Sequence, residues 1–279
     1  EQWNSRLQGL FIEDRVSLSA KFAWSKKAVP FSEKNKLKYK PITKGKSWGK
    51  EWDSAWFCLS GNLKKEWRGK KIIADLDFSG EGLVYDSKGK EIQGITNASI
   101  WDQNFARTRV LIPKTCIKNN KVEIWVEAAA NSLFGIFVDV DPEQDNPKRH
   151  GTFDAKVETI DIGTFREDIW HLYLDVRILL GLIEKLEDDS TQRLRIINSL
   201  NQAVIAFKDD KKDANSSRKI LSAELNKRAS SSELNVAAVG HAHIDTGWLW
   251  PVKETIRKCA RTFTTQLDLI DRYPDYVFG

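Results

Sequence analysis

A short apolar run that ends in closely spaced polar residues constrains the fold of this chain more than any other feature. Residues 236–239 read Val-Ala-Ala-Val, and Gly-His-Ala-His-Ile-Asp follows directly as residues 240–245. An uninterrupted run of small and β-branched residues is typical of a strand covered on both faces, as in a parallel α/β sheet. Because alternate side chains of a strand share a face, His241, His243 and Asp245 project together if the strand continues that far.

The residue types at this strand end suit a metal site. Imidazole and carboxylate groups are ligands that zinc and other divalent transition ions take in proteins. Ligands of α/β sheets and β/α barrels gather at the carboxyl ends of strands, where these groups are expected. Supporting or capping roles stay open, since Asp245 or Thr246 is also suited to cap the next helix. We favour the metal site because several ionisable groups rarely end a buried strand without a site to serve.

An amphipathic helix is predicted directly after this segment. Pro251 suits a helix start, and the pattern stops near Tyr273-Pro274. Between these points, apolar residues recur at helical spacing: Val252, Ile256, Cys259, Phe263, Leu267 and Ile270. Strand, functional loop and helix together form one unit of a parallel β/α structure.

The composition is that of an ordinary globular protein. The chain has 279 residues, of which 41% are hydrophobic and 30% charged, so it is long enough for two domains. No apolar run approaches the roughly 20 residues that span a bilayer, and the first residues hold no signal-peptide core. Cys58, Cys116 and Cys259 are odd in number and set far apart in apolar patterns, so we expect buried thiols. A cytoplasmic protein without a membrane partner is the expectation.

Positive charge is concentrated near the N-terminus. Residues 1–50 hold 12 Lys and Arg against 4 Asp and Glu, a net +8, whereas the whole chain carries +5. The stretch Lys34–Lys50 also contains Tyr39 and Trp48, but it lacks a recognisable nucleic-acid-binding motif. We interpret it as a solvated face and expect no nucleic-acid partner.

Four segments follow one another along the chain. Residues 1–35 are expected to form a helical lead, because Trp3, Leu7, Leu10 and Phe11 make a helix-like apolar stripe. Residues 36–160 are expected to form a β-sandwich accessory domain from short runs separated by turns at 86–89 and 119–120: residues 55–59, 71–78, 82–85, 108–112, 121–127 and 133–140.

The later segments change character. Residues 161–230 show helical periodicity and form a predicted helical linker segment, which ends in a serine run at 230–232. Residues 231–279 then begin an incomplete β/α domain. The predicted fold class is therefore a multidomain α/β protein, in which an N-terminal β-sandwich and a helical connecting segment precede the start of a parallel β/α barrel.

Tryptophans are frequent in the predicted sandwich, and two roles are open for them. Exposed aromatic side chains commonly stack on sugars, whereas large buried ones fill interiors. We favour core packing for this set: Trp48, Trp52, Trp56, Trp67, Trp101 and Trp125.

The polar strand end also carries a family resemblance. The stretch Gly240-His-Ala-His-Ile-Asp-Thr-Gly-Trp-Leu-Trp-Pro251, followed by Arg257-Lys-Cys-Ala-Arg-Thr-Phe263 and Arg272-Tyr-Pro-Asp-Tyr-Val-Phe278, resembles the start of the catalytic domain of glycoside hydrolase family 38, the α-mannosidases. The upstream part resembles the cytosolic and bacterial branch of that family through Trp48-Gly, Trp56-Phe, Gly80-Glu-Gly-Leu-Val-Tyr-Asp86 and Glu127-Ala-Ala-Ala-Asn-Ser-Leu-Phe-Gly135.

The resemblance implies a retaining α-mannosidase whose barrel holds one zinc ion. It assigns His243 and Asp245 as metal ligands, His241 as a supporting residue, and Trp248 as an aromatic that lines the subsite of the mannose being cleaved. The implied partner is a mannose-containing oligosaccharide, and a homo-oligomer is compatible with the sequence. A divalent cation can chelate sugar hydroxyls and help distort the ring toward an oxocarbenium-like transition state.

In that family the nucleophile, the acid/base carboxylate and the remaining zinc ligands follow further along the chain than Gly279. We therefore expect no catalytic residue within these 279 residues, and we expect this piece alone to be inactive and to bind zinc poorly. Two alternatives remain. His-x-His at a strand end also occurs in metal-dependent amidohydrolases and related nucleases, and a Trp-rich sandwich also fits a non-catalytic carbohydrate-binding or assembly module.

Overall fold

The computed structural model describes residues 2–97, 106–131, 153–208, 213–227, 236–248 and 250–279. The chain divides into two units. One comprises residues 1–14 and 164–236, and the other comprises residues 15–163 and 237–279.

The first unit is helical. Its elements are α1 (Gln2–Gln8), α2 (Glu167–Ile183), α3 (Thr191–Phe207) and α4 (Ala214–Leu225). Phe11 is fully buried, and its ring packs edge-on against Trp170 and Tyr173 at centroid distances of 5.1 and 5.2 Å. The side chains of Ser190 and Asp213 accept hydrogen bonds from first-turn amides, which explains where α3 and α4 begin. Helical periodicity therefore predicted α2, α3 and α4 correctly.

The predicted helical lead over residues 1–35 is much shorter than expected. Helix α1 ends at Gln8, and the chain continues as strands β1 (Ile12–Ser17) and β2 (Ser19–Ser25). The buried side chains of Leu18, Ala20 and Phe22 alternate with exposed Ser19 and Lys21. Such a period of two places one face of a strand on a core, so the sandwich begins earlier than residue 36.

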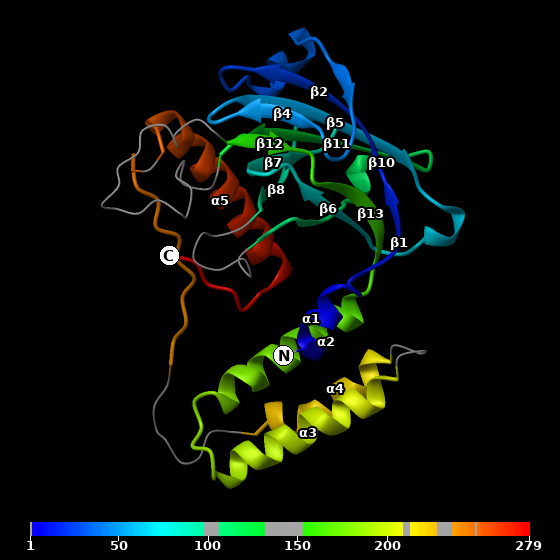
Figure 1. The fold of residues 1–279 in the computed structure, drawn as a ribbon, viewed down its shortest axis with the longest axis vertical. Helices are drawn as coiled ribbons and strands as arrows, with labels where there is room; N and C mark the ends of the chain where they lie inside the picture. Colours follow the sequence, from blue (N-terminus) through cyan, green and yellow to red (C-terminus); the bar gives the residue numbers. More distant parts are fainter. Residues whose placement is uncertain (1, 98–105, 132–152, 209–212, 228–235, 249) are drawn as a thin grey trace. The chain divides into compact units, whose positions relative to one another are not determined.

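The second unit is built on antiparallel sheets (Figure 1). A four-stranded sheet has the order β1-β13-β6-β9, a seven-stranded sheet has the order β3-β2-β5-β11-β7-β8 with β10 beside β11, and β12 pairs with β4. The remaining strands are β3 (Lys40–Ile42), β4 (Ser47–Lys50), β5 (Ser54–Asn62), β6 (Ile72–Asp77), β7 (Glu81–Tyr85), β8 (Glu91–Thr96), β9 (Arg109–Leu111), β10 (Ile117–Lys118), β11 (Lys121–Ala129), β12 (Asp154–Lys156) and β13 (Thr159–Phe165). Short 3₁₀ helices lie at η1 (Phe31–Lys36), η2 (Lys65–Trp67) and η4 (Lys114–Cys116).

A single hydrophobic cluster fills the sandwich. It draws buried side chains from both larger sheets, including Val126 of β11 and Ile162 of β13. Phe57 of β5 packs on Phe78, which follows β6, with ring centroids 4.3 Å apart. The sequence prediction of an N-terminal β-sandwich is confirmed.

Both predicted turns of the sandwich are present. Asp86 accepts hydrogen bonds from the amides of Lys88 and Lys90 in the turn from β7 to β8. Asn119 and Asn120 have positive φ angles of 50° and 60° between β10 and β11, a conformation that asparagine tolerates better than most residues. The strand predicted over residues 133–140 lies outside the described residues.

Most of the described sandwich tryptophans are core residues. Trp48, Trp56 and Trp67 are buried, and the indoles of the first two donate to the carbonyls of Phe78 and Val29. Trp52 and Trp125 are half-buried, and Trp101 lies outside the described residues.

Trp125 has neighbours that compete with a sugar for its ring. The Lys34 ammonium lies 4.0 Å from the centroid of that ring, and the Tyr39 ring packs edge-on against it at 5.7 Å. Lys34 itself is only 5% exposed. One lysine of the basic N-terminal stretch is therefore a buried packing residue, which corrects the prediction that the whole stretch is a solvated face.

The expectation of three buried thiols is only partly right. All three cysteines are free, but Cys116 alone is buried, while Cys58 and Cys259 are half-exposed. Apolar neighbours in sequence did not decide burial at Cys58, because strand side chains alternate between the two faces of the sheet.

Helix α5 (Val252–Arg272) follows Pro251 as predicted, but its buried face is not the expected one. Its buried residues are Glu254, Arg257, Lys258 and Arg261, whereas its apolar residues are largely exposed, with Ile256 at 71% and Phe263 at 56%. The helix packs by its charged face on β8, where the absence of a side chain at Gly94 admits the backbone of Arg261. The Gly94 amide donates to Thr265 Oγ1 at 3.0 Å. Amphipathicity predicted the helix but not its orientation.

The strand predicted over residues 236–239 does not form. Val236 and Val239 are 90% and 58% exposed, and among the described residues this segment has only a single parallel bridge, between Gly240 and Phe278. A strand buried on both faces needs neighbouring strands to take up its backbone hydrogen bonds, and the described residues provide one bridge.

Candidate functional site

The candidate site lies on the irregular segment between Gly240 and helix α5. Gly240 anchors its start, because the Gly240 amide donates to Val277 O at 2.8 Å and Gly240 O accepts from the Gly279 amide at 3.0 Å. A Cβ atom at residue 240 would clash with the Tyr276 hydroxyl, so a larger residue here requires this ring to shift. Tyr276 in turn donates a hydrogen bond to Gln266 of α5.

The three polar residues of the predicted strand end separate into two groups. His243 Nε2 lies 3.1 Å from Asp245 Oδ1, and the two side chains are 74% and 40% exposed. His241 Nδ1 instead lies 3.2 Å from the carbonyl oxygen of Gly279. The structure thus brings together the two residues predicted to bind metal and directs the third, predicted to support them, toward the backbone. Their roles remain predictions.

The donor set fits zinc in kind but not in number. An imidazole nitrogen and a carboxylate oxygen are ordinary zinc ligands, and both are accessible here. A protein zinc site has about four ligands, or three and an open position. Among the described residues, no group of three or more His, Cys, Asp or Glu side chains is placed to hold a metal ion.

Trp248 is placed by the buried Trp250. Trp248 is 53% exposed, and its ring packs edge-on against the Trp250 ring, with centroids 5.5 Å apart. The Trp248 amide donates to Trp250 O at 3.2 Å. Trp250 is 8% exposed, and its indole donates to Thr255 Oγ1 at 3.1 Å. The Thr255 hydroxyl donates to Thr246 O at 2.9 Å. The first turn of α5 therefore fixes this segment beside an aromatic ring that a ligand can reach.

A buried cluster of charged residues, which sequence reasoning missed, joins α5 to the sandwich. Its members are Glu81 of β7, Glu127 of β11, and Glu254, Arg257, Lys258 and Arg261 of α5. Each of these side chains is at most 12% exposed. A signal was present in the sequence, because the four helix residues recur at spacings of three and four and so share one face.

The charged cluster contains two centres of pairing. Arg257 donates to both Glu127 and Glu254 and also to Ser54 Oγ at 3.2 Å. Burial lowers the pKa of Arg257, but the neighbouring carboxylates Glu127 and Glu254 outweigh it and raise the pKa overall. Buried charges are tolerated when they are paired in this way.

Glu81 is the second centre. Its Oε2 accepts hydrogen bonds from Lys258 at 2.7 Å, from Asn131 at 2.9 Å and from Arg261 at 3.1 Å. Burial raises the pKa of Glu81, but the charges of Arg261 and Lys258 outweigh it, so the pKa is lowered overall. Glu81 is therefore a carboxylate held in its ionised form by the helix.

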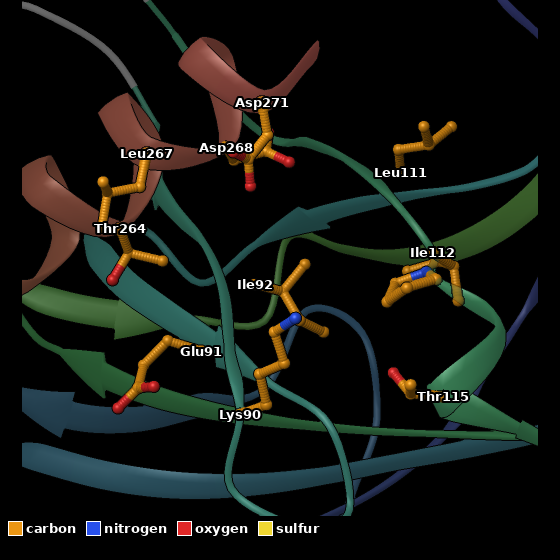
Figure 2. A pocket seen from close by; sticks show the side chains of 11 residues that line it. Lys90, Glu91, Ile92, Leu111, Ile112, Thr115, Thr264, Leu267, Asp268 and Asp271 are labelled. Atoms are coloured by element: carbon orange, nitrogen blue, oxygen red, sulfur yellow. The ribbon is translucent and has the colours of Figure 1, made fainter.

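Two hollows adjoin α5. A small one of about 230 Å³ lies beside the candidate site and is lined by Glu81, Ala242, His243, Ile244, Trp250, Lys258, Arg261 and Thr262. A larger one of about 480 Å³ lies at the other end of the helix, where Figure 2 shows Glu91, Asp268 and Asp271 around Ile92 and Ile112. The larger hollow contains none of the predicted site residues. The smaller hollow is the one that adjoins a predicted site residue, His243.

Comparison with known proteins decides the family. Residues 15–156 match the family described as "Alpha-mannosidase, jelly roll domain", and residues 233–279 match "Glycosyl hydrolases family 38 N-terminal domain". The chain belongs to the glycoside hydrolase family 38 α-mannosidases. The jelly-roll match covers most of the sandwich but not β13, and the second match covers the candidate site and α5.

The curated relatives are α-mannosidases of greater length. "Alpha-mannosidase 2C1" of Mus musculus is 27% identical over 98% of this chain and 26% of its own length. "Alpha-mannosidase" of Saccharomyces cerevisiae is 29% identical over 94% of this chain and 24% of its own length. The chain thus spans about a quarter of these relatives. Among solved structures, "Ruminococcus gnavus Beta-glucuronidase" is 16% identical with a TM-score of 0.34, covering 54% of this chain and 28% of that chain, which is too weak a similarity to support an argument.

Proposed function

We propose that this chain is the N-terminal portion of a zinc-dependent, retaining α-mannosidase that hydrolyses α-mannosidic bonds in oligosaccharides. One observation carries the proposal: the segment that matches the family 38 domain holds His243 and Asp245 with their donor atoms 3.1 Å apart. That segment also carries the half-exposed Trp248. Imidazole and carboxylate ligands suit a divalent metal ion, and an accessible aromatic ring offers an apolar face to a ligand.

A parallel β/α barrel is part of this proposal. The bridge between Gly240 and Phe278 is parallel, and helix α5 connects its two sides. This arrangement is the smallest form of a strand-helix-strand unit. This arrangement supports the proposal that the segment is part of a parallel β/α barrel.

In the proposed mechanism, His243 and Asp245 would hold the zinc ion, which when bound would chelate adjacent sugar hydroxyls and favour ring distortion. The 3.1 Å contact places the two proposed donor atoms, His243 Nε2 and Asp245 Oδ1, beside one another. Trp248 offers its face to the mannose ring and excludes water from one side of it. Nucleophile and acid/base carboxylates are assigned to residues beyond this chain.

The test is an assay of the full-length protein on an aryl α-mannoside. Hydrolysis is expected, with the α-anomer of mannose as first product by ¹H NMR. His243→Ala and Asp245→Ala are expected to abolish both zinc binding and turnover. The control Asp268→Ala removes a carboxylate near the other end of α5 and is expected to leave both unchanged. Turnover of an amide or phosphodiester substrate without turnover of the mannoside would favour the amidohydrolase alternative instead.

The cellular location and the partners of the protein are also part of the proposal. Three free cysteines fit a reducing compartment, and we propose the cytoplasm. Within the part of the chain that the structure covers, no helix is long and apolar enough to cross a membrane. The proposed ligand is a mannose-containing oligosaccharide, and neither nucleic acid nor membrane is proposed as a partner.

A further inference from the structure

We propose that Glu81 of the β-sandwich is a positioning residue for the candidate site, acting through Lys258 and Trp250 on the segment that carries Trp248. This inference rests on the proposed function only in treating the segment that carries Trp248 as a substrate-binding segment. The contacts among the residues do not depend on that function. The sandwich then contributes to substrate binding through helix α5.

The first link joins the sandwich to the helix. Glu81 begins β7, where its backbone pairs with Ala129 of β11 and Thr96 of β8, so its position is set on both sides. Its Oε2 then accepts a hydrogen bond from Lys258 Nζ at 2.7 Å. The two side chains are 12% and 10% exposed, so little water competes with the pair.

The second link joins the helix to the site segment. The same Lys258 ammonium lies 4.6 Å from the centroid of the Trp250 ring. An ammonium at this distance from an indole is attracted to it, more strongly when water is excluded, as it is around the buried Trp250. Glu81 thus determines where the Lys258 charge lies, and that charge helps to determine where the Trp250 ring lies.

The third link reaches the accessible ring. Trp250 O accepts the Trp248 amide at 3.2 Å, and the two rings meet edge-on at 5.5 Å. Lys258 and Trp250 also line the small hollow together with Glu81 and His243. Loss of the Glu81 carboxylate would release the ammonium from its place, and the Trp248 platform would lose its fixed orientation.

The chain offers a matched control within the same charged cluster. Glu127 is also a buried carboxylate paired with α5, but its partners are Arg257 and Arg261. Glu127→Gln and Glu81→Gln therefore make the same chemical change at the same interface. Only the second removes a carboxylate that pairs with Lys258.

The experiment uses the full-length protein and two readouts. Hydrogen–deuterium exchange with mass spectrometry reports the protection of the peptide spanning residues 240–251, and steady-state kinetics on an aryl α-mannoside report KM and kcat separately. Glu81→Gln is expected to speed exchange in this peptide and to raise KM roughly 3- to 10-fold, the scale of one cation–π contact, with little change in kcat. Glu127→Gln is expected to leave the peptide and KM near wild type.

Substitutions at Lys258 give an independent route. Lys258→Met is expected to reproduce the effect of Glu81→Gln, and Lys258→Arg is expected to restore protection and KM, because a guanidinium also pairs with carboxylate and stacks on indole. Wild-type exchange in Glu81→Gln, or equal acceleration by Glu127→Gln, would overturn the proposal. Selective acceleration in a protein that hydrolyses no α-mannoside would leave the positioning role standing and sink the proposed function.

Discussion

Arg257 of helix α5 donates hydrogen bonds to Glu127 of strand β11 across the interface between the helix and the sandwich. Both residues are less than a tenth exposed, so the pair is shielded from solvent. The charged face of the helix is therefore the one that the sandwich holds. Removing Glu127 would leave the buried Arg257 with Glu254 as its remaining carboxylate partner in this cluster.

We expect Glu127→Ala to lower the free energy of unfolding by about 1–3 kcal/mol, because the buried Arg257 would keep Glu254 but lose its hydrogen bond to Glu127. Urea unfolding followed by circular dichroism measures the change. Asp188→Ala is the control, since Asp188 pairs with Arg193 but is 95% exposed. An equal loss of unfolding free energy in the two variants would show that the buried pair stabilises the fold no more than the exposed pair.

The lowered pKa of Glu81 predicts a loss of stability in acid. The folded pKa lies below the unfolded value, so the contribution of this carboxylate is fully present above the unfolded pKa of about 4.3 and is lost as the pH falls through the folded pKa. Urea unfolding between about pH 6 and about pH 3 should therefore show a shallower dependence on pH in Glu81→Gln than in wild type. Parallel curves for the two proteins would contradict the assignment.

Gly240→Ala tests the anchor of the candidate site. A Cβ atom there would lie 2.4 Å from the Tyr276 hydroxyl, so the ring must move and the bridge to Phe278 is strained. We expect a loss of about 1–3 kcal/mol of stability, the usual cost of overpacking. Gly247→Ala is the matched control, because the nearest atom to its new Cβ would be 3.5 Å away, an ordinary contact. Thermal unfolding of the two variants measures this difference in stability.

Cys116 and Cys58 are expected to resist alkylation. Burial raises the pKa of the Cys116 thiol to about 12 and that of the Cys58 thiol to about 11, with nearby carboxylates adding to both effects. At about pH 8 the thiolate fraction of both is then far below that of a free cysteine, and the thiolate is the reactive form. Iodoacetamide labelling followed by peptide mass spectrometry should therefore be slow at both positions in the folded protein and fast in urea.

Features set by neighbouring residues were predictable from the sequence. Helices α2 and α3 follow from the spacing of apolar residues close in sequence, and both form as predicted. The turns at Asp86 and Asn119 likewise depend on a few adjacent residues, and both are observed. The orientation of α5 was not predictable, because an amphipathic pattern says that two faces differ and not which one meets a partner. The strand at 236–239 failed for a related reason, since a strand forms only beside another strand. The approach of His243 to Asp245 follows from their spacing, whereas the role of Glu81 depends on contacts 177 residues apart.

The exposed apolar face of α5 gives the last prediction. Ile256 is 71% exposed, so Ile256→Lys is expected to change the unfolding free energy of the 279-residue chain by less than about 0.5 kcal/mol, the usual range for surface positions. If the segment begins a β/α barrel, as proposed, the same residue is covered in the full-length protein, and the substitution there places an unpaired charge against apolar neighbours. A clear fall in melting temperature is then expected in the full-length protein alone. Lys253→Gln, an exposed polar change on the same helix, is the control and should be silent in both forms. If Ile256→Lys is equally silent in the full-length protein, this face of α5 does not pack on a barrel.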